Sequence, residues 1–189
     1  MSAVTPDGRV IFTRWIGGTQ WDVYSIHIDG SDLAIALAIS PDDEGVSAVT
    51  PAGRVIFTRR TGGTQTDIYS ILADGSEGEV ALATSLDNES LAGLTPDGRV
   101  IFSRIAGGTQ SDLYSIFADG RGGEVPLAIS TDEEFYGDDD SEAVTVSGKV
   151  IFERLTAGVQ SDLYIINVDG SDEMVLVDTP DDETFSALF

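Results

Sequence analysis

Short runs of β-branched, aliphatic and aromatic residues alternate with polar turn residues along the chain. In the first stretch the runs cover residues 2–5, 10–14, 22–28 and 34–39. They are separated by Pro6-Asp7-Gly8, Gly17-Gly18-Thr19 and Asp29-Gly30-Ser31, all of which are favourable turn sequences. No window shows a helical period of useful length. The pattern therefore predicts a meander of four short antiparallel strands.

This pattern occurs four times. The stretch at residues 2–14 returns at 47–59, at 92–104 and, more loosely, at 142–154, and the equivalent glycines are spaced by 45, 45 and 50 residues. Four-stranded units that recur every 40 to 50 residues or so are typical of β-propeller blades. We therefore predict an all-β chain that forms a single propeller domain with four 4-stranded antiparallel blades. The blades are expected at approximately 2–45, 46–90, 91–140 and 141–183, with a further first-strand-like segment at 184–189.

The chain is acidic, with 33 Asp and Glu against 10 Lys and Arg and a formal net charge of -23. Such a charge disfavours nucleic acid and anionic membranes and favours cations or basic partners. An alternative explanation is that the acidic surface keeps the protein soluble at high salt, where ions screen the repulsion between its carboxylates. The chain has no cysteine, which excludes disulfides and thiol chemistry. It shows neither a signal peptide nor an apolar run of membrane-spanning length, so we expect a soluble protein.

The repeated residues carry a family resemblance. Thr-Pro-Asp-Gly-Arg-Val-Ile-Phe at 5–12, Asp-Val-Tyr at 22–24, Asp-Gly-Ser at 29–31 and an apolar fourth strand resemble the PD40 (WD40-like) repeat of TolB-like β-propellers. The chain departs from this repeat at Ala52, which replaces the turn Asp, and at Val146-Ser147, which replaces Pro-Asp. The resemblance covers nearly the whole chain and implies a six- to eight-bladed scaffold for binding partners, in the periplasm. Some relatives carry such propellers on peptidases.

Some residues recur in every copy. If each hairpin turns around its Gly-Gly pair, or around Ala-Gly in the fourth copy, the recurring arginine lies opposite the recurring aspartate and phenylalanine lies opposite tyrosine. This register predicts cross-strand ion pairs. A group that is present in every blade is more often a structural link than part of a ligand site. The expected pairs are Arg14–Asp22, Arg59–Asp67, Arg104–Asp112 and Arg154–Asp162, and the recurring Gln20, Gln65, Gln110 and Gln160 are expected to bond loop backbone.

Positions at which the copies differ are the candidates for function. Trp15 and Trp21 occur only in the first copy, where they flank the turn between its second and third strands. An acidic stretch at 133–142 is five residues longer than the corresponding link after the first copy. Both are expected on one rim, because in a meander blade the loop between strands two and three shares a face with the link to the next blade. Loops on one face of a rigid scaffold commonly carry binding residues. The ligand-binding candidates are Trp15, Trp21, Phe135, Tyr136, Asp138, Asp139 and Asp140. The alternative is that the tryptophans cover a neighbouring blade or a dimer contact.

The residues offer little for catalysis. His27 is the only histidine, and neither a nucleophile elbow nor a His or Cys cluster for a metal is visible. Asp29 and Asp32 could supply oxygen ligands to a divalent cation such as calcium. The full calcium loop with its distal Glu is absent, however, and Asp-Gly is a common hairpin turn. We therefore expect no cofactor and no catalytic residues.

The sequence thus predicts a non-enzymatic scaffold that recognises a protein, a peptide or a small polar ligand on its loop face. Two alternatives stay open: a carbohydrate lyase or hydrolase that uses carboxylates or a divalent cation, and a self-assembling repeat protein without a ligand. The assembly is equally open. The chain could form a closed four-bladed ring, half of an eight-bladed ring in a homodimer, or a piece of a longer propeller.

Overall fold

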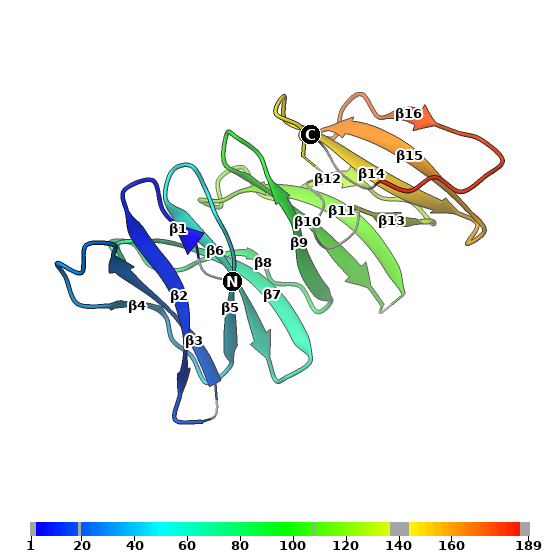
Figure 1. Cartoon of the computed structure of the whole chain (residues 1–189). Helices are drawn as coiled ribbons and strands as arrows, with labels where there is room; N and C mark the ends of the chain where they lie inside the picture. Colours follow the sequence, from blue (N-terminus) through cyan, green and yellow to red (C-terminus); the bar gives the residue numbers. More distant parts are fainter. Residues whose placement is uncertain (1–2, 19, 108, 137–143, 186–189) are drawn as a thin grey trace. The chain divides into compact units, whose positions relative to one another are not determined.

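A computed structural model describes residues 3–18, 20–107, 109–136 and 144–185 of the chain (Figure 1). All regular secondary structure within these residues is β-strand. The chain divides into two compact units, and each unit contains two four-stranded antiparallel meanders. The first unit comprises Met1–Leu86 with Ala118–Arg121, and the second comprises Asp87–Phe117 with Gly122–Phe189.

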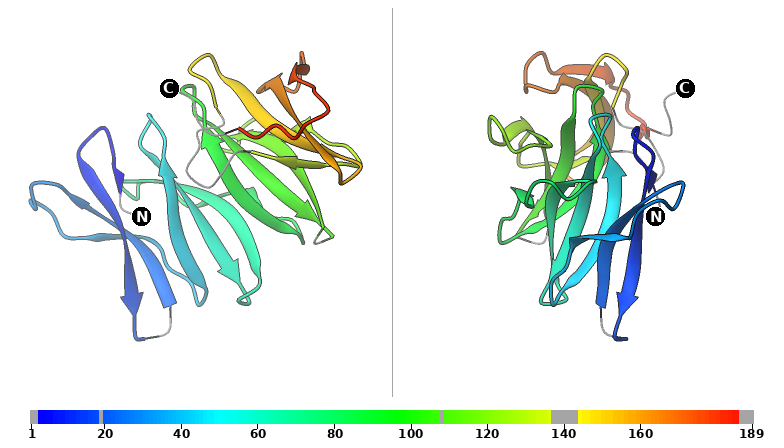
Figure 2. Two further views of the ribbon diagram at one scale, coloured as in Figure 1. Left: turned by 45° about the vertical axis from the view of Figure 1, so that its right-hand side comes forward. Right: turned by 90° about the vertical axis from the view of Figure 1, so that its left-hand side faces the viewer.

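The first unit holds the sheets that we call blades 1 and 2. In each sheet the strands lie side by side in sequence order, as the two turned views in Figure 2 also show. Blade 1 consists of β1 (Ala3–Val4), β2 (Arg9–Ile16), β3 (Gln20–His27) and β4 (Ile35–Ala38). Blade 2 consists of β5 (Asp43–Val49), β6 (Arg54–Thr61), β7 (Gln65–Leu72) and β8 (Val80–Ala83).

The second unit holds blades 3 and 4, which have the same strand order. Blade 3 consists of β9 (Asn88–Leu94), β10 (Arg99–Ala106), β11 (Gln110–Phe117) and β12 (Val125–Ala128). Blade 4 consists of β13 (Glu133–Phe135), β14 (Lys149–Thr156), β15 (Gln160–Asn167) and β16 (Met174–Val177). The predicted meander of four strands per repeat is therefore confirmed.

The central hairpin of each blade has the predicted register. Phe12 lies opposite Tyr24 and Arg14 lies opposite Asp22, and the equivalent residues pair in the same way in blades 2, 3 and 4. In blade 2 the turn is made by Gly62 and Gly63, which have φ angles of 60° and 77°. Glycine adopts this left-handed conformation without steric cost, so two adjacent glycines set a tight hairpin.

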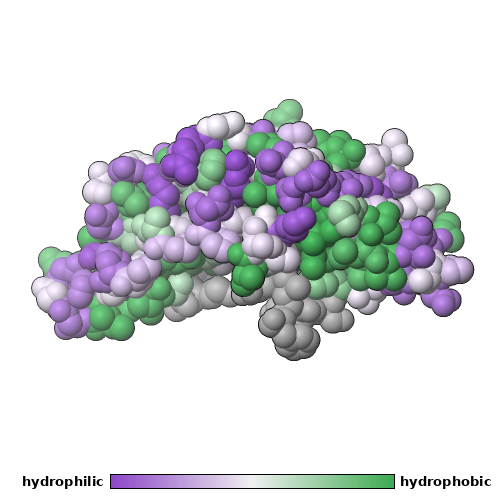
Figure 3. All heavy atoms as spheres, turned by 90° about the horizontal axis from the view of Figure 1, so that it is seen from above, coloured by the Kyte–Doolittle hydropathy of each residue, from purple (hydrophilic) through white to green (hydrophobic). Residues whose placement is uncertain are grey.

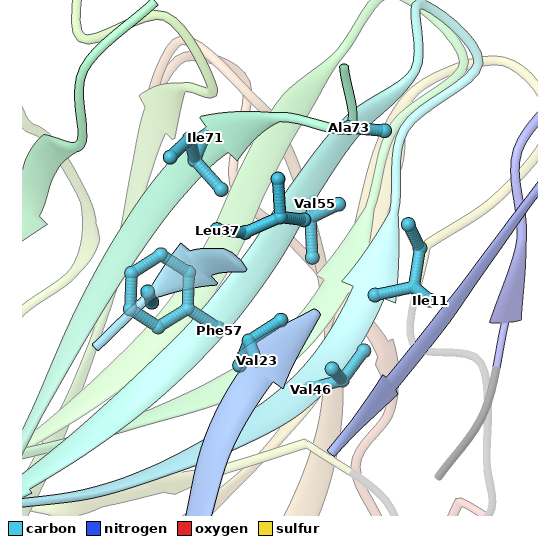
Figure 4. Close-up of a cluster of buried hydrophobic side chains, with 9 residues drawn as sticks. Ile11, Val23, Leu37, Val46, Val55, Phe57, Ile71 and Ala73 are labelled. Atoms are coloured by element: carbon cyan, nitrogen blue, oxygen red, sulfur yellow. The ribbon is translucent and has the colours of Figure 1, made fainter. Parts of the chain in front are cut away.

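The core of the first unit lies between the facing sheets of blades 1 and 2. Ile11 and Val23 from blade 1 meet Val55 and Phe57 from blade 2, and all four side chains are fully buried. Figure 4 shows these side chains converging from both sheets. Burial of such a side chain stabilises the fold by about 1.5–3 kcal/mol. The second unit has an equivalent core between blades 3 and 4.

A hydrogen bond from the third strand of one blade also joins it to the next blade. In the first unit Ser25 Oγ donates to the carbonyl oxygen of Ala73 at 2.6 Å. In the second unit Ser115 Oγ donates to the carbonyl oxygen of Val168 at 2.7 Å. Both serines are buried, so these bonds satisfy carbonyl groups that water does not reach.

The blade boundaries differ from those expected. The boundaries predicted at 45/46 and 90/91 fall inside β5 and β9, because the acidic link residues already pair with the next strand, as Glu44 does with Arg59. Pairing in blade 4 likewise begins before the approximate boundary expected at 140/141, since β13 pairs with β14 through Glu134 and Arg154. Beyond the residues that the structure does not describe, Val144 also pairs with β14, opposite Val150.

The expected extra strand at 184–189 is described only as far as Phe185. Residues 178–185 form no strand, although Phe185 is buried. Among the described residues no helix is long and apolar enough to cross a membrane. Hydrophobic residues reach the surface among hydrophilic ones, as the green atoms in Figure 3 show.

Candidate functional site: the tryptophan hairpin and the acidic links

Trp15 and Trp21 form a pair at the end of the β2–β3 hairpin. The two residues lie directly opposite each other in the strand register, and their ring centroids are 5.2 Å apart at an interplanar angle of 56°. Their exposed fractions are 46% and 44%, so about half of each indole is in contact with solvent. Cross-strand contact holds the two rings together and restricts their motion. The result is a small aromatic platform on a rigid hairpin.

The backbone beneath this platform is held by the link between blades 1 and 2. The Trp21 N–H donates to Asp43 Oδ1 at 3.0 Å. On the other side of the turn, Gly18 has a φ of +75° and lies 3.8 Å from Trp15 Nε1, measured from the position a Cβ would occupy. The link thus holds the hairpin backbone at Trp21. This geometry suits a preformed binding surface, because little order has to be gained on binding.

The acidic links have mostly structural partners. In the link between blades 1 and 2, Asp42 Oδ1 accepts from the N–H of Gly62 at 3.2 Å and Asp43 accepts from Trp21. The following Glu44 accepts from Arg59 Nε at 2.8 Å. Each acid of this link therefore caps a hairpin or neutralises an arginine. The expected acidic rim for a ligand is to that extent already engaged within the fold.

The predicted Arg–Asp ion pairs are wrong, although the strand register is right. In blades 2, 3 and 4 the arginine pairs instead with a fully buried glutamate from the first strand and with a second glutamate just before the fourth strand. The nitrogen–oxygen distances of these pairs are 2.8–2.9 Å. The triads are Arg59 with Glu44 and Glu79, Arg104 with Glu89 and Glu124, and Arg154 with Glu134 and Glu173.

The aromatic residues explain why the arginine turns toward the glutamates. In blade 2 the Arg59 guanidinium lies 4.6 Å from the centroid of Tyr69, and Tyr69 stacks on Phe57 at 5.6 Å. This stacking directs the guanidinium away from Asp67, which instead accepts a hydrogen bond from Gln65 at 3.0 Å. In blade 3, hydrogen bonds to Glu124 outweigh burial and raise the pKa of Arg104, so the charge of that arginine is secure.

The recurring glutamines bond loop backbone, as predicted. In every blade the glutamine at the start of the third strand donates its side-chain amide to a carbonyl oxygen of the following link. The acceptors are the carbonyl oxygens of Ser40, Ser85, Ser130 and Thr179 for Gln20, Gln65, Gln110 and Gln160, in that order. These contacts tie each link to the hairpin that precedes it.

The two aspartates considered for a cation have other partners. Asp32 Oδ2 accepts from Arg9 Nη1 and Nη2 at 2.9 and 2.8 Å, and Asp32 Oδ1 accepts from the His27 N–H. Asp29 Oδ1 caps its own turn by accepting from the Ser31 N–H at 2.8 Å. A carboxylate that is bonded to arginine is a poor cation ligand. Within the described parts of the chain no group of three or more acidic or histidine side chains could hold a metal ion.

The remaining candidates belong to the second unit. Phe135 is 40% exposed in β13. Tyr136 packs against the core between blades 3 and 4, and its hydroxyl donates to Ser90 Oγ at 3.1 Å. Asp138, Asp139 and Asp140 lie outside the described residues. The structure thus brings Trp15 and Trp21 together and gives Tyr136 a role in packing.

Two surface hollows lie beside the Pro-Asp-Gly-type turns, one in each unit. The first is lined by residues that include Pro6 and Pro51, and the second by residues that include Pro96 and Val146. Because equivalent hollows occur in both units, they follow from the packing of one blade on the next. The tryptophan platform, by contrast, occurs only in blade 1.

The buried glutamates make stability depend on pH. Burial raises the pKa of Glu44 and of Glu134 above the ordinary 4.5, so the folded state holds these protons more tightly than the unfolded state. Their contribution to stability therefore falls as pH rises from about 4.5 through the folded pKa. In contrast, hydrogen bonds from Ser31 lower the pKa of Asp29 to about 2, and that contribution is lost as pH falls below 3.8.

We therefore expect the melting temperature to fall as the pH rises from about 4.5 to 8. Circular dichroism melts across this range at constant high salt would measure it. Glu44→Gln removes one of the groups that bind protons more tightly in the folded state, so the decline toward pH 8 should be smaller in this variant. A melting temperature that rises steadily up to pH 8 in the unmodified chain would contradict this account.

The comparisons with known proteins bear on the fold. No protein-family model matches the chain, and no curated protein matches it. A solved structure assigned to TolB from Agrobacterium tumefaciens is similar at 17% identity and a TM-score of 0.60, over 93% of this chain and 64% of that chain. TolB from Acinetobacter baumannii is similar at 17% identity and a TM-score of 0.55, over 97% and 44%.

A puromycin-hydrolyzing peptidase from Mycobacterium tuberculosis is similar at 13% identity and a TM-score of 0.60, over 93% of this chain and 28% of that chain. The chain thus spans less than two thirds of the length of each of these proteins. Identities this low show a shared fold and nothing about activity. Together with the four meanders, the similarity to TolB shows that this chain is an all-β protein of the β-propeller fold with four 4-stranded antiparallel blades.

Proposed function

We propose that this chain is a non-enzymatic binding module built from PD40-type repeats, and that its Trp15–Trp21 platform takes a protein or peptide partner. The observation that carries the proposal is the half-exposed indole pair on a fixed hairpin. Indoles bury a large area at little entropic cost and are enriched where one protein binds another. The equivalent positions in blade 2 are Arg60 and Thr66, so the fold does not require aromatic residues there.

The charge of the chain suggests the chemistry of the partner. A net charge of -23 attracts basic segments over distances of about one Debye length and speeds their encounter. The indole faces favour cationic or apolar side chains, because the ring face carries partial negative charge. A peptide segment with Lys or Arg beside an apolar residue fits both features.

A peptide selection tests this proposal. Random peptides displayed on phage are selected against the unmodified chain, and the enriched peptides are titrated while intrinsic fluorescence is followed. Trp15 and Trp21 are the only two tryptophans, so the emission reports only on this platform. We expect enriched peptides to contain basic residues and to shift the emission.

The matched variant is Trp15→Arg with Trp21→Thr, which gives blade 1 the residue pair of blade 2. Its binding, followed by calorimetry, should weaken by at least about tenfold. Its melting temperature should change little, because surface substitutions cost about 0.5 kcal/mol or less. Replacing Arg60 and Thr66 with alanine is the control and should leave binding unchanged. Equal binding by the tryptophan variant, or a marked loss of its stability, would rule out the platform as the site.

A further inference from the structure

Within each unit, a link serves both the blade before it and the blade after it. In the first unit Asp43 bonds the Trp21 N–H of blade 1, while Glu44 reaches forward to Arg59 of blade 2. In the second unit Glu134 likewise reaches forward to Arg154 of blade 4. We call the contact with the preceding blade the backward contact and the contact with the following blade the forward contact. The backward contact holds the link against the preceding blade, and the forward contact binds the link to the following blade. The same link design thus joins blades in both units.

Residues 179–183, which follow blade 4, make only the backward contacts of such a link. Asp182 Oδ1 accepts from the Ser161 N–H at 3.2 Å, as Asp43 does from Trp21 in blade 1. The side chain of Glu183 accepts from Thr179 Oγ1, which corresponds to the bond between Glu44 and Ser40. Glu183 is thereby placed like the glutamates that bind arginine. Its Oε2 is buried and unbonded, as is Oε2 of Glu44, Glu89 and Glu134, but unlike those three glutamates Glu183 forms no ion pair with an arginine among the described residues.

Blade 1 has the converse feature. Arg14 stands at the position of Arg59, Arg104 and Arg154 and lies 4.3 Å from the centroid of Tyr24. The other three arginines are 13–14% exposed and bind two glutamates each, whereas Arg14 is exposed and forms no ion pair with any described residue. Blade 1 therefore presents an arginine that lacks its glutamate, and Glu183 is a glutamate that lacks its arginine.

The apolar surfaces show the same complementarity. Within the units, Leu37 in the fourth strand of blade 1 and Leu127 in the fourth strand of blade 3 are at most 6% exposed, but Leu176 in β16 is 46% exposed. On the facing side, Phe57 of blade 2 is fully buried, whereas Phe12 of blade 1 is only partly buried. Blade 4 and blade 1 thus each leave uncovered the side that a neighbouring blade covers elsewhere.

We propose that blade 4 of one copy docks on blade 1 of a second copy, and that Glu183 pairs with Arg14 of that copy. The contact repeats the link-to-blade design of both units and matches an unpaired carboxylate with an unpaired guanidinium. Because each copy carries both halves, the contact joins unlike surfaces of two copies.

Charge reversal tests the pairing, with light scattering on the 189-residue chain in moderate salt as the measurement. The unmodified chain should have a mass that rises with concentration from 20.0 kDa to about twice that value. Arg14→Glu and Glu183→Arg should each weaken self-association by at least about tenfold, because each places like charges together. Arg60→Glu makes the same change in net charge as Arg14→Glu at an exposed position of blade 2, so it should leave the association intact.

Mixing the two reversed variants decides between a second copy and the same chain. In an equimolar mixture, each contact between unlike variants joins opposite charges, either Glu183 with Arg14 or the two reversed side chains with each other. Association should therefore return in the mixture although neither variant associates alone. A mixture that stays at the monomer mass would overturn the proposal, as would a monomeric unmodified chain at all concentrations. If the unmodified chain is monomeric and the effects of Arg14→Glu and Glu183→Arg on the free energy of unfolding are not additive, the two residues pair within a single chain.

Discussion

Replacing Arg59 with alanine is expected to lower the free energy of unfolding by about 3–5 kcal/mol, because the variant leaves a buried carboxylate without its counter-charge. The side chain of Glu44 is fully buried, and that of Arg59 is 13% exposed. Glu44 keeps its hydrogen bond from Ser40 but loses the bond from Arg59 Nε. Urea denaturation near neutral pH, followed by circular dichroism, would measure the change.

Arg14 is the matched control for this substitution. It occupies the same strand position and stacks on the same kind of tyrosine, but it forms no ion pair with any residue that the structure describes. At low protein concentration, Arg14→Ala should therefore cost about 1 kcal/mol or less. Both variants lose the stacking of arginine on tyrosine, so the difference between their losses of unfolding free energy measures the effect of the unpaired buried carboxylate. Equal costs would show that the ion pair contributes nothing beyond the cation–π contact.

The cost of Arg59→Ala should also depend on pH in a defined direction. Burial already raises the pKa of Glu44, and loss of the neighbouring positive charge raises it further. At about pH 5 the carboxyl of the variant can bind a proton and avoid the penalty of a buried charge. The destabilisation should therefore be smaller at pH 5 than at pH 7. A cost that is independent of pH would indicate that the lost energy comes from packing.

Replacing Gly170 with alanine is expected to cost about 2–5 kcal/mol. Gly170 has a φ of +80°, which disfavours any residue with a Cβ. A Cβ at this position would lie 2.6 Å from the carbonyl oxygen of Pro126 in β12, and this atom cannot rotate away. The turn after β15 would have to separate from blade 3. Chemical denaturation gives the cost directly.

Gly30 provides the control for the backbone contribution. It lies at the equivalent turn of blade 1 with a φ of +68°, but a Cβ there would meet nothing within 4 Å. Gly30→Ala should therefore cost only the left-handed conformation, about 1–2 kcal/mol. The excess cost at Gly170 measures how closely the turn of blade 4 approaches blade 3. If the two variants lose the same stability, the turn is free to move and the contact does not hold the two blades together.

Much of the fold could be predicted from the sequence because its signals are local. The turn glycines and the alternating apolar runs set the strands, and the hairpin length sets the register that places Phe12 opposite Tyr24. The repeat period then indicates the blade as the unit. The sequence does not reveal the glutamate partners of Arg59, Arg104 and Arg154. The strand register shows which backbone positions lie opposite each other, but it does not show in which direction a long side chain points. Stacking on Tyr69 in blade 2 makes that choice.

The glutamates that bind the arginines did leave a signal. Glu44, Glu89 and Glu134 recur at constant spacing, but the acidic links suggested a solvent-exposed rim. Burial of a carboxylate depends on the blade that packs over it, and no local pattern reveals that. The position of the insertion was misjudged for a related reason. Its flanking residues Phe135 and Val144 pair within the first strand of blade 4, which only the strand pairing shows.

The place of that insertion reflects a feature of the earlier blades. In β5 the pairing with β6 skips Ser47, and in β9 the pairing with β10 skips Ala92. A bulge residue of this kind carries no ladder hydrogen bond, so chain added there leaves the register on both sides unchanged. The first strands of blades 2 and 3 thus each have a position at which the length of the strand is uncoupled from the register of the sheet. Evolution can lengthen the chain at this position, as can protein engineering, without rebuilding the blade.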